Sequence, residues 1–254
     1  MGALEVSPQS QARGEREVPG TADPRSGTPL SARATRLIAI TGLASFALIM
    51  VAALILAPPL WDSPSQTAPA AHVAAYLETY HGRLLVSQLV YSLGMGLFLC
   101  FTAGLWSWLR RIEPAPEAVS AVFAFGAVAL TLLILTSFAT ADVMAYRPQQ
   151  PALAVALTDT TFGLLALSGV PTAVCLGAYA AIVLRYRCLP TWTAWLALVA
   201  VDAHLLIAAS FLSHGSFLGL EGSVIVVVPA TFFAWIFATS AVLLRTSLSS
   251  RAAS

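Results

Sequence analysis

The sequence predicts an all-α membrane protein, a bundle of six transmembrane helices with both termini in the cytoplasm. The composition supports this class, because 58% of the residues are hydrophobic and only 10% are charged. Six apolar segments are each long enough to cross a hydrocarbon core of ~30 Å, which takes roughly 20 helical residues. These segments are residues 37–56, 84–108, 118–141, 160–184, 191–212 and 222–244.

The arginines predict how the six helices are oriented. All 13 basic residues are arginine, and only Arg83 and Arg147 flank the segments on one side of the predicted membrane. The other eleven lie before the first segment, after the last, or in the second and fourth connections. Because basic residues are retained on the cytoplasmic side, that side is predicted to be the cytoplasm.

The two ends of the chain are predicted to be cytoplasmic tails. Residues 1–34 are rich in Ser, Pro, Gly, Arg and Glu without apolar periodicity, which predicts a disordered segment. The first apolar segment is longer than the core of a signal peptide and no convincing Ala-x-Ala cleavage site follows it, so we expect an uncleaved anchor. The membrane domain is predicted to span 35–246, and residues 247–254 form the second tail.

The first connection, residues 57–83, is the longest. Pro58 and Pro59 are expected to end the first helix. Its second half has apolar residues at helical spacing, which predicts a short amphipathic helix over 70–81 that lies in the outer interface. Those apolar residues are Val73, Tyr76, Leu77 and Tyr80.

The fourth segment carries small residues at every fourth position, a pattern that lets another helix approach closely. The partner is either a helix of the same chain or one of a second copy, and the latter would make a homo-oligomer. Pro171 lies in the same segment and is expected to kink it. The small residues are Gly169, Ala173, Gly177 and Ala181.

Asp202 is the most informative polar residue. It lies near the middle of the fifth segment, roughly 16 Å from its start at ~1.5 Å per residue. An acidic group at this depth costs about 2.5–3.5 kcal/mol on insertion scales, so it is expected to face the bundle interior and to be functional. The alternative is a neutral carboxyl group hydrogen-bonded to another helix. His204 is roughly 200° further round the same helix and points to the opposite face.

Two further acids, Asp142 and Asp159, bracket the third connection and are expected at the same outer mouth. No nucleophile elbow, phosphate loop or nucleotide fingerprint is present, and we predict no cofactor. A single Glu-x-x-His motif, Glu78 to His81, falls short of the two that a di-iron bundle needs, and we predict no metal site. The net charge of +1 argues against nucleic acid as a partner.

Three motifs support a resemblance. They are Arg36-Leu37 through Thr41-Gly42-Leu43, the segment 73–83 that enters the second helix, and Leu189-Pro190-Thr191-Trp192. Over residues 33–245 the chain resembles a family of small bacterial multi-pass membrane proteins described only as a domain of unknown function. The resemblance implies about six helices in the bacterial cytoplasmic membrane and brings no catalytic residues.

Two functions are compatible with these features. The first is a bundle in the lipid bilayer that binds or carries a small lipid-like or hydrophobic molecule. The alternative is a membrane-embedded enzyme resembling a terpene cyclase, in which Asp202 is the acid, Asp142 or Asp159 assists, and aromatic side chains stabilise a cation. An enclosed apolar cavity beside Asp202 would favour the enzyme. The candidate substrate-binding residues are Trp195, His204, His214, Phe232 and Trp235.

Overall fold

The structure is a computed structural model that describes residues 31–59, 62, 64, 68–147, 150–212 and 224–252. Every regular element in this part of the chain is a helix. Six helical spans are long and apolar enough to cross a membrane, which confirms the predicted fold class. Most of the predicted N-terminal tail and His214 lie outside the described residues.

The described residues form nine helical elements, eight of which build the six spans. The first and fourth spans each join two consecutive elements, the others lie within single α-helices, and a short 3₁₀ turn follows the fifth span. The elements are α1 (Ala32–Val51), the π-helical turn η1 (Ala52–Leu56), α2 (Ala70–Ile112), α3 (Val119–Tyr146), α4 (Pro151–Leu167), α5 (Gly169–Tyr186), α6 (Thr191–Ala208), the 3₁₀ turn η3 (Ala209–Leu212) and α7 (Val224–Ala252).

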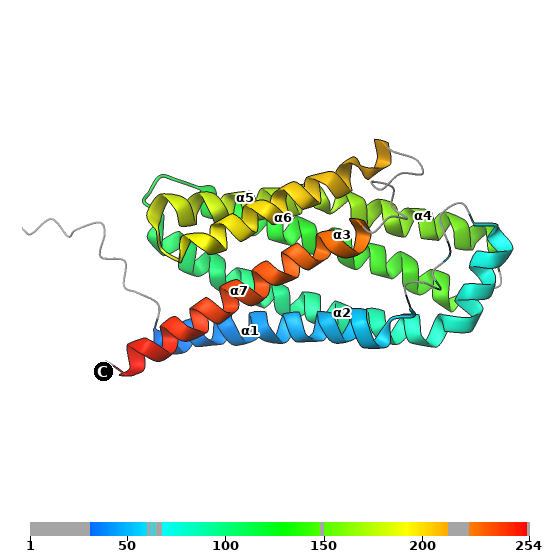
Figure 1. The fold of residues 1–254 in the computed structure, drawn as a ribbon, viewed down its shortest axis with the longest axis horizontal. Helices are drawn as coiled ribbons and strands as arrows, with labels where there is room; N and C mark the ends of the chain where they lie inside the picture. The colour runs from blue at the N-terminus through cyan, green and yellow to red at the C-terminus, as the bar shows by residue number, and fades with distance from the viewer. Residues whose placement is uncertain are drawn as a thin grey trace, which may run out of the picture.

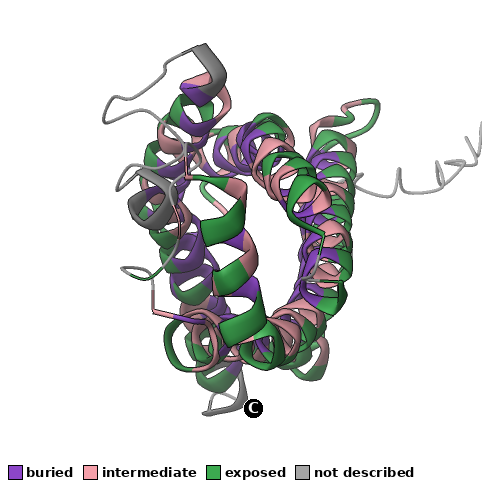
Figure 2. Cartoon of the chain, turned by 90° about the vertical axis from the view of Figure 1, so that its right-hand side faces the viewer, coloured by how far each residue is buried: buried purple, intermediate pink, exposed green. Residues whose placement is uncertain are grey.

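Six of the helices form a closed ring. Following the ring, α1 packs on α2, α2 on α3, α3 on α5, α5 on α6, α6 on α7, and α7 returns to α1. Figure 2 views this arrangement end-on, and Figure 1 shows it from the side. The remaining helix, α4, packs against α3 and α2 at one end of the bundle. The side chains that point toward the ring axis therefore come from helices far apart in the sequence.

Most arginines gather at one end of this ring, which we call the arginine end. They occupy the start of α1, the ends of α2 and α5, and the C-terminal part of α7 (Figure 1). This is the distribution that the alternating charge pattern predicted. The described arginines that define the arginine end are Arg33, Arg36, Arg110, Arg111, Arg185, Arg187 and Arg245.

Arg83, one of the two exceptions, has a structural contact that accounts for its position. Its guanidinium group donates hydrogen bonds to the carbonyl oxygens of Ile55, Leu56 and Ala57, at 3.2, 3.2 and 2.9 Å. These carbonyls belong to the end of the first span, where helix geometry leaves them without backbone partners. A cation at the C-terminal end of a helix is also favoured by the helix dipole. Arg83 thus caps the first span.

The amphipathic helix predicted in the outer interface is instead the first part of α2, which runs without interruption from Ala70 to Ile112. The prediction missed the packing of this segment: Val73 and Leu77 are buried against α3 and α4, whereas Tyr76 and Tyr80 are half-buried. The buried cluster consists of Val73, Leu77, Ala141, Met144 and Ala154.

The predicted fourth segment is interrupted by a break between α4 and α5 at Ser168. Pro171 accounts for this break, because it has no backbone N–H to donate to the carbonyl of Leu167 four residues earlier. The predicted kink therefore takes the form of a joint one turn before the proline. The connection predicted over 142–159 is also shorter than expected, since α3 extends to Tyr146 and α4 begins with Pro151 as its first residue.

Half of the small-residue stripe packs inside this chain. A side chain at Gly169 would overlap the carbonyl oxygen of His204, so α5 and α6 are in backbone contact there. Ala173 is also buried. A second copy could not use these two positions, and that part of the predicted oligomer contact is wrong. Gly177 and Ala181 are the more open half of the stripe.

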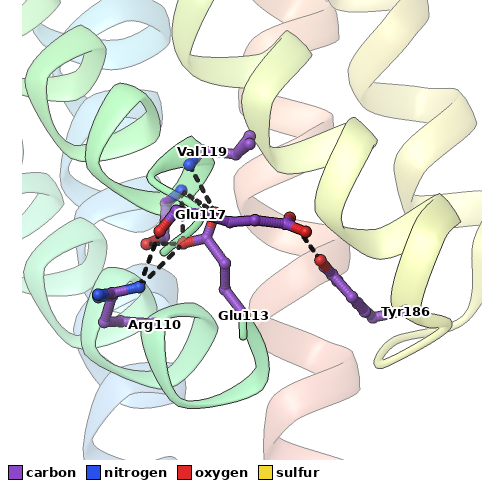
Figure 3. A network of polar contacts seen from close by, with 6 residues as sticks. Arg110, Glu113, Glu117, Val119 and Tyr186 are labelled. Carbon is purple, nitrogen blue, oxygen red and sulfur yellow. Dashed lines mark hydrogen bonds and ion pairs between the residues drawn. The ribbon is translucent and has the colours of Figure 1, made fainter. Parts of the chain in front are cut away.

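A polar network at the arginine end holds α2, α3 and α5 in place (Figure 3). The Glu113 carboxylate accepts hydrogen bonds from the backbone N–H groups of Val119, at 2.5 Å, and Ser120, at 3.1 Å, and from the Ser120 hydroxyl. It thereby caps the start of α3. Burial alone would raise the pKa of Glu113, but these bonds and nearby Arg110 outweigh it and lower the pKa.

The neighbouring Glu117 links this turn to the end of α5. It accepts hydrogen bonds from Arg185, at 2.8 Å, and from the Tyr186 hydroxyl, at 2.6 Å. Figure 3 shows the second of these contacts. The turn between α2 and α3 is therefore tied to the end of α5, the neighbour of α3 in the ring.

Candidate functional site: an apolar cavity inside the ring

The ring encloses a cavity of about 700 Å³, within the size range of small-molecule sites. Its walls come from all six ring helices, from η1 and from the joint between α4 and α5. The α1 side chains that line it, Phe46 and Met50, are in the second half of that helix, and those of α7 are in its first half. The cavity thus lies in the half of the bundle remote from the arginine end.

The walls are mainly aromatic and aliphatic. Tyr91 packs edge-on against Phe138 with ring centroids 4.7 Å apart, and it contacts Phe233 at 6.4 Å. On the other side, Phe46 of α1 and Phe237 of α7 lie 5.2 Å apart. Among the described lining residues none is an Asp, Glu, Lys or Arg, and the imidazole of His204 is the one titratable group apart from the Tyr91 hydroxyl. Such walls favour an apolar ligand.

A cluster of aromatic side chains closes the cavity on the side toward the arginine end. Trp235 is fully buried and stacks on Phe232, which lines the cavity, with centroids 6.0 Å apart. It also contacts Phe101 at 6.0 Å and Tyr179 at 5.1 Å. The Tyr179 hydroxyl in turn donates to Thr193 at 2.9 Å. We call these residues the aromatic floor.

One corner of the cavity is polar. Ser168 and Thr172 lie one turn apart beside the joint of α4 and α5. His204 of α6 lies beside them, because α6 approaches α5 most closely at Gly169. The His204 side chain contacts the ring of Phe232 at 5.8 Å. The His204 residue is only 7% exposed. We call Ser168, Thr172 and His204 the polar corner.

The seam between α1 and α7 opens toward the cavity. Near the arginine end the two helices are so close that a side chain at Gly42 would overlap the Ser240 hydroxyl. One turn further along α1, Phe46 and Phe237 still touch. Beyond this pair, η1 and α7 both line the cavity, and Leu54 of η1 is 76% exposed. Figure 1 shows α7 crossing away from α1 in this direction. Among the residues that the structure describes, the cavity therefore has a lateral opening between η1 and α7.

The structure brings together two of the predicted binding residues, His204 and Phe232, on the cavity wall. Trp235 is behind the wall, in the aromatic floor. Trp195 is 61% exposed and faces away from the bundle. His214 lies outside the described residues.

Asp202 does not face the interior, so the prediction of its orientation was wrong. The residue is exposed, whereas His204, two residues later, is buried against α5 and α7. Because two residues turn a helix by roughly 200°, only one of the pair can point inward. Packing of α5 against α6 at Gly169 selects His204 as the inward residue. Asp202 is not among the cavity-lining residues.

The other two predicted acids, Asp142 and Asp159, differ in how far they are buried. Asp159 is exposed on α4. Asp142 is half-buried on α3, and its Oδ1 has no hydrogen-bond partner among the described residues. Asp142 lies one turn after Phe138 on α3. Gln88, whose Oε1 also lacks a partner among the described residues, lies one turn before Tyr91 on the neighbouring α2. These groups are adjacent to the cavity but do not line it.

Sequence reasoning missed Tyr91 and Thr172 as site residues. Serine and threonine are common in transmembrane helices, where they hydrogen-bond to the preceding turn, so their presence carries little signal. Pro171 was the one indication in the sequence that this region is irregular. In the part of the chain that the structure describes, no three His, Cys, Asp or Glu residues are close enough to hold a metal ion.

The fold and the cavity define this chain as a multi-pass membrane protein whose helices enclose an apolar space. In comparisons with known proteins, no protein-family model, curated protein or solved structure matches the chain. The inference of function therefore rests on the cavity itself.

Proposed function

We propose that this protein binds a small lipid-like molecule in the cavity and admits it from the bilayer through the opening between α1 and α7. The observation that carries this proposal is the combination of an apolar cavity with a lateral opening. A soluble metabolite would gain little from aromatic walls without charged groups, whereas a hydrocarbon chain can pack against them. A ligand already dissolved in the bilayer can reach the opening without crossing water.

We infer further that the arginine end faces the cytoplasm of a bacterial cell, which places the cavity toward the outer leaflet. Reporter fusions after Ser254 test this orientation. A fluorescent protein fused there is expected to fluoresce, and alkaline phosphatase fused at the same position is expected to be inactive. The reverse pattern would overturn the assignment of sides while leaving the cavity unaffected.

The alternative of a cyclase-like enzyme is less well supported. It depended on Asp202 as an acid inside an enclosed cavity, and this side chain is on the opposite face of α6 from the cavity. The lining residues that the structure describes include no carboxyl group. Binding, without acid catalysis by Asp202, is the function that the geometry favours.

Photolabelling tests the proposed binding site. The purified full-length protein, in nanodiscs of phosphatidylethanolamine and phosphatidylglycerol, is irradiated with a diazirine-bearing analogue of farnesene. Labelling is expected to concentrate on peptides of α1, α2 and α7 that line the cavity. The variant Ala230→Trp places a bulky side chain at the opening and is expected to reduce this labelling about tenfold.

Leu132→Trp is the matched control, because Leu132 is an exposed α3 residue that does not line the cavity. It is expected to label like the wild type. Labelling spread evenly over the lipid-facing side chains, and equal in Ala230→Trp and Leu132→Trp, would show that the cavity holds no ligand.

A further inference from the structure

The polar corner contains hydrogen-bond acceptors whose own donors are already used. The Ser168 hydroxyl donates to the Leu165 carbonyl at 2.6 Å, and the Thr172 hydroxyl donates to the Ser168 carbonyl at 2.7 Å. A hydroxyl group has a single hydrogen, so both oxygens are left only with lone pairs. Neither side chain can donate a hydrogen bond to a ligand in this arrangement.

His204 is restricted in the same way. Its Nδ1 lies 2.8 Å from the carbonyl oxygen of Ala200. Because a carbonyl can only accept, Nδ1 must carry the hydrogen, and in the neutral imidazole Nε2 then carries a lone pair. Among the described residues the His204 ring has one hydrogen bond, through Nδ1, and Nε2 has no partner. Nε2 is not among the side-chain atoms that are both fully buried and unpartnered, although His204 as a whole is only 7% exposed and lines the cavity. His204 therefore adds a third acceptor to the corner, and this one lacks a partner.

The surroundings determine which donor fits. An unpaired acceptor in an apolar site is costly, and a ligand that brings a donor relieves this cost. A carboxylate or an ammonium ion would enter a cavity in which the described lining residues include no carboxylate, lysine or arginine to compensate it. A ketone, ester or ether has no hydrogen to donate. A neutral hydroxyl group has a hydrogen to donate and brings no charge into the cavity.

We propose that the ligand is a neutral long-chain alcohol whose hydroxyl group donates to Nε2 of His204 in the polar corner. Its hydrocarbon chain lies along the aromatic walls toward the opening between α1 and α7. This inference rests on the proposed function and specifies its ligand class. It also assigns His204 as the residue that selects the head group.

Competition in the photolabelling assay tests the head group. Unlabelled farnesol, farnesyl methyl ether and farnesoic acid compete with the diazirine probe for the wild-type protein in the same nanodiscs. Farnesol is expected to compete at about a tenfold lower concentration than the ether, since the two share a chain and differ in the donor. The acid at neutral pH is expected to compete no better than the ether.

Two variants on α6 assign the effect to His204. His204→Phe keeps an aromatic ring but removes the acceptor, and is expected to bring farnesol to the same potency as the ether. Asp202→Asn changes the exposed face of the same helix and is expected to keep the wild-type difference. If His204→Phe does not fold, His204→Leu, which likewise removes the acceptor, is expected to give the same equal potency of farnesol and the ether.

The outcomes separate the two proposals. Equal competition by farnesol and its ether in the wild type would overturn the head-group inference while the binding site stands. Better competition by the acid would also overturn it. If the probe does not label the cavity and no compound competes, the proposed function itself fails.

Discussion

Replacing Gly169 with alanine is expected to lower the free energy of unfolding by about 1–3 kcal/mol, the usual cost of overpacking. The added methyl group would overlap the backbone carbonyl oxygen of His204, and backbone cannot rotate away as a flexible side chain can. The two helices α5 and α6 must therefore separate. Because His204 lines the cavity, the same change is expected to weaken labelling by the diazirine probe.

Gly177→Ala is the matched control for this prediction. Gly177 lies in the same helix, but an added methyl group would meet no atom within 4 Å. Alanine is the better helix former by about 0.8–1 kcal/mol, so this variant is expected to be neutral or more stable. Thermal unfolding in detergent, followed by circular dichroism, compares the two. Equal stability of Gly169→Ala and Gly177→Ala would show that α5 and α6 do not approach as described.

Replacing Trp235 with alanine is expected to have the largest effect, a loss of about 3–5 kcal/mol. This indole is fully buried and contacts the rings of Phe232, Phe101 and Tyr179, so its removal leaves a void in the aromatic floor. In a membrane the stabilisation comes mainly from close packing, which a void removes directly. The void would also deepen the cavity toward the arginine end.

Trp235→Phe separates the loss of packing from the loss of the indole N–H. Trp235 Nε1 makes no hydrogen bond of ordinary geometry to the described residues, although the Tyr179 side chain is close enough for a weak polar contact, so removing the N–H is expected to cost little. Phenylalanine fills most of the space and is expected to cost less than about 1.5 kcal/mol. Unfolding by a denaturing detergent, monitored by gel mobility, measures both variants. A loss as large for Trp235→Phe as for Trp235→Ala would contradict the assignment of Trp235 to a packing role.

The sequence alone was sufficient to predict the number of spans and the clustering of the arginines at one end of the bundle. Both depend on properties of short segments: the length of an apolar run and the charge at its ends. The close contact at Gly169 was also foreseeable, because small residues at every fourth position mark one helix face. The outer part of α2 was misplaced because its apolar stripe fits a lipid interface as well as a neighbouring helix.

The inward face of each helix could not be read from the chain. In a soluble helix a polar face marks the outside, but a spanning helix is apolar all round. For α6, the depth of Asp202 suggested an interior acid, and it was the contact between Gly169 and His204 that turned His204 inward instead. The cavity has a similar origin. It exists because α1 and α7, which are far apart in the sequence, touch at Phe46 and Phe237 and diverge beyond this pair. The distance between two such helices cannot be predicted from the residues of either one.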